Sequence, residues 1–230
     1  MSLYYQGEHV TLYHGDCLEE HREWLEADVL VTDPPYGIDW ESHKGSFYGK
    51  TGGSIQKGNR ARIVKNDKTT TVRDLALREW GTRPAIVFGS WRAARPAGVN
   101  HRLIWHKKGQ APGPLNAAFM SQDEEIYVLG KGFRKSAPPL RSVIATDEHR
   151  STQVRKIGHP TPKPIDLMEK LVDRCLEEWV IADPFAGSGA TLIAARGMGR
   201  KAIGVELEEK YCEIIAKRLD QQVIDFEALA

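Results

Sequence analysis

The chain has 230 residues, of which 41% are hydrophobic and 27% charged, and its formal net charge at pH 7 is +1. This length suits one sizeable domain, and the hydrophobic fraction is enough to build a core. No apolar run approaches the ~18 residues of a membrane-spanning helix, and the first residues lack the basic-then-apolar pattern of a signal peptide. We therefore expect a soluble protein that has no membrane partner.

The three cysteines, Cys17, Cys175 and Cys212, are far apart and have no His or Cys neighbours at the spacing of metal ligands. We therefore expect neither a disulfide framework nor a bound metal. A reducing cytoplasm is the simplest location for such a chain.

Basic residues gather in two windows that lack periodic structure. Residues 37–72 carry seven Lys or Arg against three acids, and residues 131–164 carry eight against two. The remainder of the chain is acidic, so we interpret the windows as basic loops on an acidic body. Such loops suit a polyanion such as nucleic acid. Solvated surface charge explains the charge pattern alone equally well.

Taken in chain order, the first half of the sequence alternates between strand and helix patterns. Residues 9–37 predict a strand, a turn, a short helix and a second strand at 29–32, and residues 38–67 predict a long polar loop. A helix then precedes a strand at Ala85–Phe88, and further strands are expected within 101–109 and 123–132.

The second half continues the alternation after an irregular basic stretch at 134–157. A helical face follows at 165–176, a strand and a Gly-rich turn open a helix at 180–199, and a last strand and helix occupy 201–222. Strands that alternate with helices predict an α/β fold with a mostly parallel sheet.

Two of the predicted strands end in aspartate followed by proline. The stretch "VLVTDPPYG" (29–37) places Asp33 after one strand, and "VIADPFAGSG" (180–189) places Asp183 after another. Proline cannot continue a central strand, so the chain must leave the sheet at both points. Because ligands bind at the carboxyl ends of parallel strands, we expect the two aspartates at one edge of the sheet.

The second of these turns has the features of a nucleoside-binding loop. Gly187 and Gly189 let the backbone approach a ligand closely, and the helix that follows presents free N–H groups. Glu206 ends the next predicted strand, 19 residues after Gly187, where an acid commonly binds ribose hydroxyls. A nicotinamide oxidoreductase is a disfavoured alternative, because Leu192 stands where that fingerprint has Gly or Ala.

In the order and spacing of its motifs, nearly the whole chain resembles the S-adenosylmethionine-dependent DNA amino-methyltransferases of the beta group, in which the catalytic motif precedes the glycine loop. Asp33-Pro34-Pro35-Tyr36 is similar to the catalytic motif and "DPFAGSG" (183–189) to the methionine-binding motif. The segments "GDCLE" (15–19), "HPTPKP" (159–164) and "GVEL" (204–207) are similar to those that meet adenine, the methionine carboxylate and ribose.

The resemblance implies one catalytic domain over residues 1–230 with a Rossmann-like methyltransferase fold. Its sheet would be seven-stranded, mostly parallel, circularly permuted and covered by helices on both faces. The charge pattern predicts a basic loop at about 37–70 in this domain, and the resemblance implies a short target-recognition region at about 134–157.

The catalytic motif suits an exocyclic amine, which is a poor nucleophile because its lone pair is delocalised into the ring. Acceptors at the Asp33 carboxylate and the Pro34 carbonyl favour a pyramidal nitrogen, and Tyr36 offers a flat face to a base flipped out of duplex DNA. By resemblance, cofactor contacts fall to Asp16, Cys17, Thr161, Lys163, Asp183, Phe185, Gly187, Gly189 and Glu206. Contacts with DNA are expected for Pro35, Lys44, Arg60, Arg62, Arg134, Lys135 and Arg141.

The resulting prediction is a DNA methyltransferase that uses S-adenosylmethionine to methylate the N6 amine of adenine. Aspartate at position 33 favours adenine, whereas serine there leans toward cytosine-N4 in the family. Cytosine-N4 methylation, an RNA substrate and a catalytically inactive DNA-binding relative stay open as alternatives. The sequence is also compatible with a homodimer and does not indicate whether a restriction nuclease accompanies the enzyme.

Overall fold

The computed structural model describes residues 2–38, 67–108, 119, 121–135, 138–146 and 157–227. Within these ranges the chain forms one nine-stranded sheet. Its strands are β1 (Ser2–Gln6), β2 (Val10–His14), β3 (Val29–Thr32), β4 (Ala85–Gly89), β5 (Val99–Lys107), β6 (Asp123–Leu129), β7 (Val143–Thr146), β8 (Ile181–Asp183) and β9 (Ala202–Glu206).

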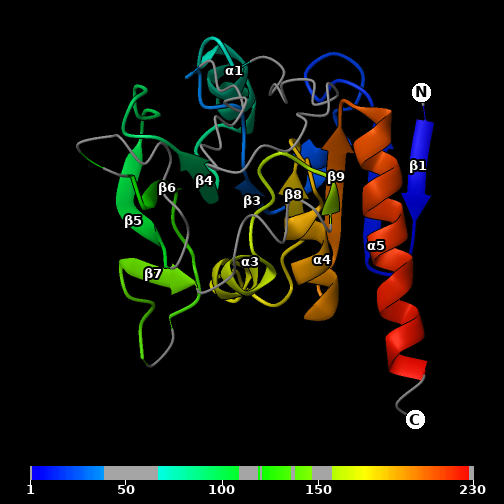
Figure 1. Cartoon of the computed structure of the whole chain (residues 1–230). Coiled ribbons are helices and arrows are strands. Elements are labelled where there is room, and N and C mark those ends of the chain that lie inside the picture. The colour runs from blue at the N-terminus through cyan, green and yellow to red at the C-terminus, as the bar shows by residue number, and fades with distance from the viewer. Residues whose placement is uncertain are drawn as a thin grey trace, which may run out of the picture.

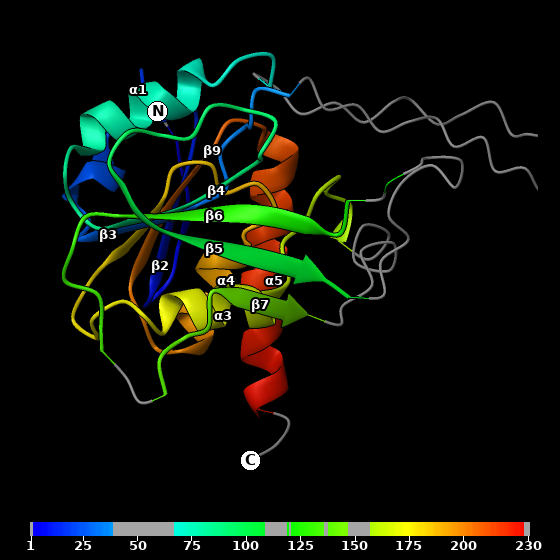
Figure 2. The same cartoon turned by 90° about the vertical axis from the view of Figure 1, so that its left-hand side faces the viewer.

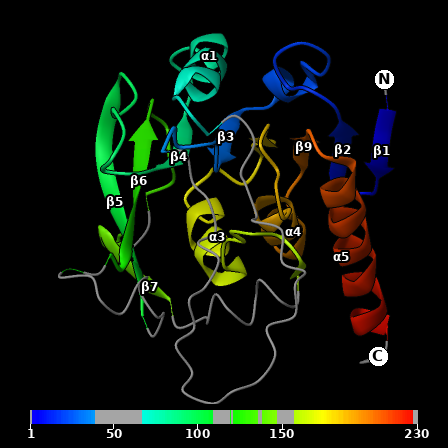
Figure 3. The same cartoon turned by 45° about the horizontal axis from the view of Figure 1, so that its top comes forward.

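The strand order is β1-β2-β9-β8-β3-β4-β6-β5-β7, and Figure 3 shows these strands side by side from β5 to β1. Five neighbouring pairs are parallel and three are antiparallel. Only β1 and β6 run against the other strands of this sheet. The carboxyl ends of the remaining strands and the amino end of β6 therefore meet at one edge, called the carboxyl edge below, and the opposite edge is called the amino edge.

Helical elements cover both faces of the sheet (Figures 1 and 2). The 3-10 helix η1 (Glu23–Glu26) and α1 (Thr71–Trp80) lie on one face, and α3 (Ile165–Val172), α4 (Ala190–Gly197) and α5 (Glu209–Glu227) lie on the other. On the first face, the buried rings of Trp24 and Trp80 stack with 5.8 Å between their centroids. On the second face, the buried side chains of Leu171, Leu192 and Ile215 pack the three helices onto the strands.

The α/β class and the mostly parallel sheet are confirmed, but the expected number of seven strands is wrong. The two strands that the sequence did not predict are β1 and β7, which are the outermost strands on the two sides of the sheet. None of the residues of β1 is buried, so its sequence has no apolar alternation to detect. β7 is only four residues long and lies inside the stretch that was expected to be irregular.

Several predictions fall on parts of the chain that the structure does not describe. Most of the basic loop at about 37–70 lies outside the described residues, and so do residues 147–156 of the expected target-recognition region. Among the described residues, no helix combines the length and the apolar character needed to cross a membrane. All three cysteines are buried free thiols.

Candidate active site

The two aspartate turns lie side by side at the carboxyl edge. β3 and β8 are parallel neighbours, with Leu30 opposite Ala182. The Thr32 hydroxyl at the end of β3 donates a buried hydrogen bond of 2.6 Å to Asp183 Oδ1 at the end of β8. The expectation that residues 33 and 183 emerge together at one edge is therefore confirmed.

The glycine loop begins at Asp183 and can be built only with glycine at two positions. The Asp183 carboxylate also accepts the backbone N–H of Phe185 at 3.2 Å, and burial raises the pKa of Asp183 to about 6. Gly187 and Gly189 have φ angles of +53° and +76°, which residues with a Cβ atom rarely adopt. A Cβ on Gly189 would lie 2.8 Å from Ile215 Cγ1, so the loop packs directly on α5.

Glu206, at the end of β9, turns its carboxylate toward this loop. Its Oε2 accepts the Gly187 N–H at 2.7 Å, and its Oε1 accepts the Glu208 N–H at 2.8 Å. Burial raises the pKa of Glu206 to about 7, although both backbone N–H groups favour its charged form. A carboxylate at a strand end beside a tight glycine turn suits the hydroxyls of a ribose.

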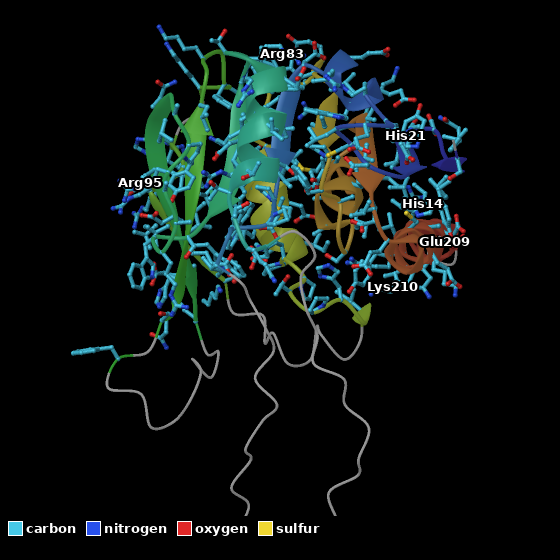
Figure 4. All side chains as sticks on the ribbon, turned by 90° about the horizontal axis from the view of Figure 1, so that it is seen from above. His14, His21, Arg83, Arg95, Glu209 and Lys210 are labelled. Carbon is cyan, nitrogen blue, oxygen red and sulfur yellow. The ribbon has the colours of Figure 1, made fainter. Side chains whose placement is uncertain are left out.

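The end of β2 brings Asp16 to the same place. β2 pairs with β9 in parallel, with His14 opposite Glu206, and the Gly15 N–H donates to the Glu206 carbonyl at 3.0 Å. The Asp16 carboxylate accepts the Leu18 N–H at 2.8 Å and thereby closes a turn. Figure 4 shows His14 beside the start of α5, which Glu209 and Lys210 mark.

The thiol of the neighbouring Cys17 is buried. It is buried in the core on the η1 face, and burial raises its pKa to about 12. Phe185 is partly buried against the same core. Both side chains therefore pack in the core on the η1 face, and their contacts with the cofactor stay a prediction.

The segment at 159–161 lies against the glycine loop. The ring of His159 packs edge-on to Tyr211 with 4.6 Å between centroids, and a Cβ on Gly187 would stand 3.3 Å from His159 Nε2. The Thr161 N–H donates to His159 Nδ1 at 3.2 Å. Thr161 is thus brought to the loop that the resemblance assigns to the cofactor.

The Asp33 turn carries a network of charged side chains. Asp33 Oδ1 accepts the Tyr36 hydroxyl at 2.7 Å, and Asp33 Oδ2 forms an ion pair with the Lys163 ammonium. The same ammonium lies 3.3 Å from Glu124 Oε2. Lys107, at the end of β5, forms an ion pair with Glu124 Oε1. Two carboxylates and two ammonium groups from four segments therefore meet at the carboxyl edge.

The network is largely withdrawn from water, so its charges act strongly on one another. Lys163 is only 7% exposed, and its ammonium lies 5.0 Å from the ring centroid of Phe88 and 5.5 Å from that of Tyr36. Burial alone would raise the pKa of Glu124, but Lys163 and Lys107 outweigh it and lower that pKa to about 2. Burial would likewise lower the pKa of Lys163, but Asp33 and Glu124 raise it.

The contacts of Lys163 differ from the prediction. The resemblance placed this lysine at the cofactor carboxylate beside Thr161, whereas the structure pairs it with Asp33 and Glu124. Sequence reasoning also missed Glu124 and Lys107 as members of the site. Their signal was their position at strand ends, but it could be used only with the antiparallel placement of β6, which brings the start of that strand to the carboxyl edge.

The structure does not bring the predicted basic DNA contacts of the second window to this edge. Arg134 donates from Nε to the Asp173 carbonyl at 2.8 Å and forms an ion pair with Asp173 just beyond α3. Lys135 and Arg141 are exposed and lie between the end of β6 and the start of β7, which is the amino edge. β7 explains this placement, because it carries the chain back to the carboxyl edge only after these residues. Their contacts with DNA stay a prediction. Lys44, Arg60 and Arg62 lie outside the described residues.

Pro34 and Pro35 complete the turn after β3. Pro34 is buried and Pro35 half-buried, so Asp33 and Tyr36 are joined by a rigid segment. The residues at the carboxyl edge thus form two neighbouring groups. One is a glycine loop with carboxylates at strand ends, suited to a nucleoside, and the other is an aspartate with fixed hydrogen-bond donors.

Comparison with known proteins agrees with this arrangement. Residues 94–217 match the family N6_N4_Mtase, described as DNA methylase. The chain is 40% identical over 246 residues to Type II methyltransferase M.HinfI of Haemophilus influenzae. The alignment covers 91% of this chain and 68% of that protein.

Two solved structures share the fold. The M1.HpyAVI–SAM complex is 21% identical with a TM-score of 0.61, covering 91% of this chain and 99% of that one. PvuII DNA methyltransferase, described as cytosine-N4-specific, is 15% identical with a TM-score of 0.63, covering 94% and 88%. From the family match and the similarity to M.HinfI, the chain belongs to the N6_N4_Mtase family of DNA methylases.

Proposed function

We propose that this chain transfers a methyl group from S-adenosylmethionine to the N6 amine of adenine in double-stranded DNA, with the target base flipped out of the helix. The observation that carries the proposal is the pairing of β3 with β8, because it sets the Asp33 turn directly beside the glycine loop. All three cysteines are free thiols, which suits action in the cytoplasm.

The glycine loop and its neighbours are suited to hold the methyl donor. Glu206 ends β9, and Asp16 lies two residues after the end of the adjacent β2. Both offer carboxylates to the ribose and adenine groups, while Gly187 and Gly189 leave no side chain in the way. Thr161 lies beside the same loop and supplies a hydroxyl toward the methionine carboxylate. When bound, S-adenosylmethionine supplies an electrophilic methyl group on a sulfonium.

The Asp33 turn is suited to activate the target amine. The Asp33 carboxylate and the Pro34 carbonyl accept the two amine N–H groups, so the nitrogen becomes pyramidal and its lone pair is freed to attack. The lone pair forms the new N–C bond while the C–S electron pair stays on sulfur. The methylated nitrogen then releases one proton, for which Asp33 is the adjacent acceptor. The ring of Tyr36 stacks on the flipped base.

The fold is shared with an enzyme described as cytosine-N4-specific, so the fold alone does not choose the base. Aspartate at the first position of the catalytic turn supports adenine in this proposal. Both bases present an amidine-like amine to the same pair of acceptors, and the choice therefore has to be measured on the product.

The test is to incubate the purified chain with S-adenosylmethionine carrying a labelled methyl group and with unmethylated duplex DNA. Digestion to nucleosides should release labelled N6-methyldeoxyadenosine. Labelled N4-methyldeoxycytidine would replace adenine by cytosine in the proposal. A parallel reaction with RNA of matched sequence separates an RNA methylase, and no labelled nucleoside from either polymer would refute the proposal.

A further inference from the structure

Glu124 has no part in the reaction as proposed, although it contacts three other members of the Asp33 network. We infer that Glu124 is a positioning residue, which holds Lys163 and Tyr36 so that the Asp33 carboxylate keeps a fixed orientation with free acceptor positions toward the target amine. This inference rests on the proposed function and adds a residue that lies about 90 positions from the catalytic motif.

The contacts of Glu124 explain why it can act on Asp33 without touching it. Its Oε2 accepts the Tyr36 hydroxyl at 2.9 Å and lies 3.3 Å from the Lys163 ammonium. Both of these donors also bind Asp33, one on each carboxylate oxygen. Lys107 anchors the other oxygen of Glu124. Glu124 therefore fixes both groups that orient the Asp33 carboxylate.

The number of acceptor positions left on Asp33 makes this arrangement matter for the reaction. Each carboxylate oxygen has two acceptor positions, so the bonds from Tyr36 and Lys163 leave one position on each oxygen of Asp33 for the target amine. If Glu124 lost its charge, Lys163 would have a single carboxylate partner left. The ammonium would then pair fully with Asp33 and compete with the amine for the remaining acceptor positions.

The proton balance of the network predicts how the charge of Glu124 affects the pH dependence of the reaction. The Tyr36 hydroxyl has one proton but lies between the carboxylates of Asp33 and Glu124. If these two carboxylates together take up one further proton, each of their contacts with the Tyr36 hydroxyl has a proton of its own. Burial raises the pKa of Asp33, Lys163 opposes this rise, and Glu124 adds to it, whereas the pKa of Glu124 is low. Asp33 is therefore protonated first as the pH falls, and a protonated Asp33 loses an acceptor position.

The charged and titratable groups that the described residues turn toward Asp33 come from four segments. Tyr36 comes from its own turn, Glu124 from β6 and Lys163 from the segment before α3. Asp183 acts from β8, since its own pKa is raised by the charge of Asp33. Lys107 acts through Glu124.

The test compares Glu124→Gln with the matched control Glu125→Gln in steady-state methylation of duplex DNA. Glu125 is the next residue and is more deeply buried than Glu124, but it faces the other side of the sheet, where it binds Arg95 at 2.9 Å and Arg102 at 3.0 Å. In Figure 4, Arg95 lies on the β5–β6 side of the molecule. The control removes the same charge from the same strand without affecting Asp33.

For Glu124→Gln we expect kcat to fall by about 10- to 100-fold, the loss typical of one charge-assisted hydrogen bond, while S-adenosylmethionine affinity is retained. The acid limb of the kcat profile should move to lower pH by about one unit, because a negative charge beside Asp33 is gone. Glu125→Gln should change neither kcat nor the position of that limb, even if it lowers the thermal stability.

Two further variants keep the test decisive if Glu124→Gln does not fold. Lys107→Met removes the ion pair that holds Glu124 to β5, and it should lower kcat by a smaller factor than Glu124→Gln. Glu124→Asp keeps the charge and should retain part of the wild-type kcat. An acid limb that stays in place in every folded variant, or an equal loss of kcat in Glu125→Gln, would overturn the inference. Failure of the wild-type chain to methylate DNA would instead refute the proposed function, so the two outcomes are distinct.

Discussion

Gly189 is the position at which the structure makes its sharpest prediction about a single methyl group. Its φ of +76° is in the left-handed region, where a residue with a Cβ costs about 1–2 kcal/mol. The added Cβ would also lie 2.8 Å from Ile215 Cγ1 and 3.0 Å from Ile215 Cγ2 in the core, and such overpacking typically costs about 1–3 kcal/mol. We therefore expect Gly189→Ala to lower the free energy of unfolding by about 2–5 kcal/mol.

Two neighbouring glycines separate the two causes. Gly199 has a φ of +66° but open space around its Cβ position, so Gly199→Ala should cost only the backbone strain, about 1–2 kcal/mol. Gly197 is the last residue of α4, has no left-handed φ and has open space. Gly197→Ala should therefore stabilise the protein by up to about 1 kcal/mol through helix propensity and unfolded-state entropy.

The measurement is equilibrium unfolding in urea of the four proteins, followed by far-UV circular dichroism without cofactor and extrapolated linearly to water. The predicted order of stability is Gly197→Ala, wild type, Gly199→Ala and Gly189→Ala. A Gly189→Ala protein that is as stable as Gly199→Ala would show that Ile215 moves aside without cost. One as stable as the wild type would refute the account of the loop as glycine-only.

Three further predictions follow from the site. Asp33→Ala should abolish methyl transfer and leave S-adenosylmethionine binding, measured by calorimetry, largely intact; retained turnover would remove Asp33 from the reaction. Because burial raises the pKa of Glu206 from 4.5 to about 7, its contribution to stability is complete below pH 4.5 and is lost as the pH rises through 7. Urea unfolding of the wild type should therefore show stability falling over that window by up to about 1.4 kcal/mol per pH unit from this group, and a Glu206→Gln protein with the same slope would contradict the assignment. Trp91 is 63% exposed two residues after the carboxyl end of β4, so Trp91→Ala should weaken binding of a labelled duplex in fluorescence anisotropy by about 1–3 kcal/mol, the cost of one stacking contact. Unchanged duplex affinity would exclude Trp91 from the DNA surface.

The features that could be predicted from the sequence are those encoded over short stretches. An apolar run that ends in Asp-Pro locates both a strand and the point where the chain leaves it, and this pattern predicts that Asp33 and Asp183 lie at one edge of the sheet. Gly187 and Gly189 are followed by an acid, Glu206, at the end of the next strand. This pattern lies within 20 residues and likewise predicts a nucleoside-binding loop.

The features that were missed depend on partners far apart in the chain. Lys163 and Asp33 are separated by 130 positions, and no local pattern indicates that such a lysine is buried between two carboxylates. The edge strands were missed for a different reason. β1 has no buried residue, and β7 is too short to show a period, so the direction in which the chain returns after Arg141 could not be read from the sequence.

The hydrogen bond from Thr32 to Asp183 ties the last residue of the catalytic strand to the first residue of the glycine loop. Under the proposed function, the spacing between methyl donor and acceptor is therefore set by the backbone pairing of β3 and β8 in the middle of the sheet. Under that function, substitutions in surface segments that leave this strand pairing intact should change DNA binding without changing this spacing. Target preference and chemical competence can therefore evolve separately in such a chain.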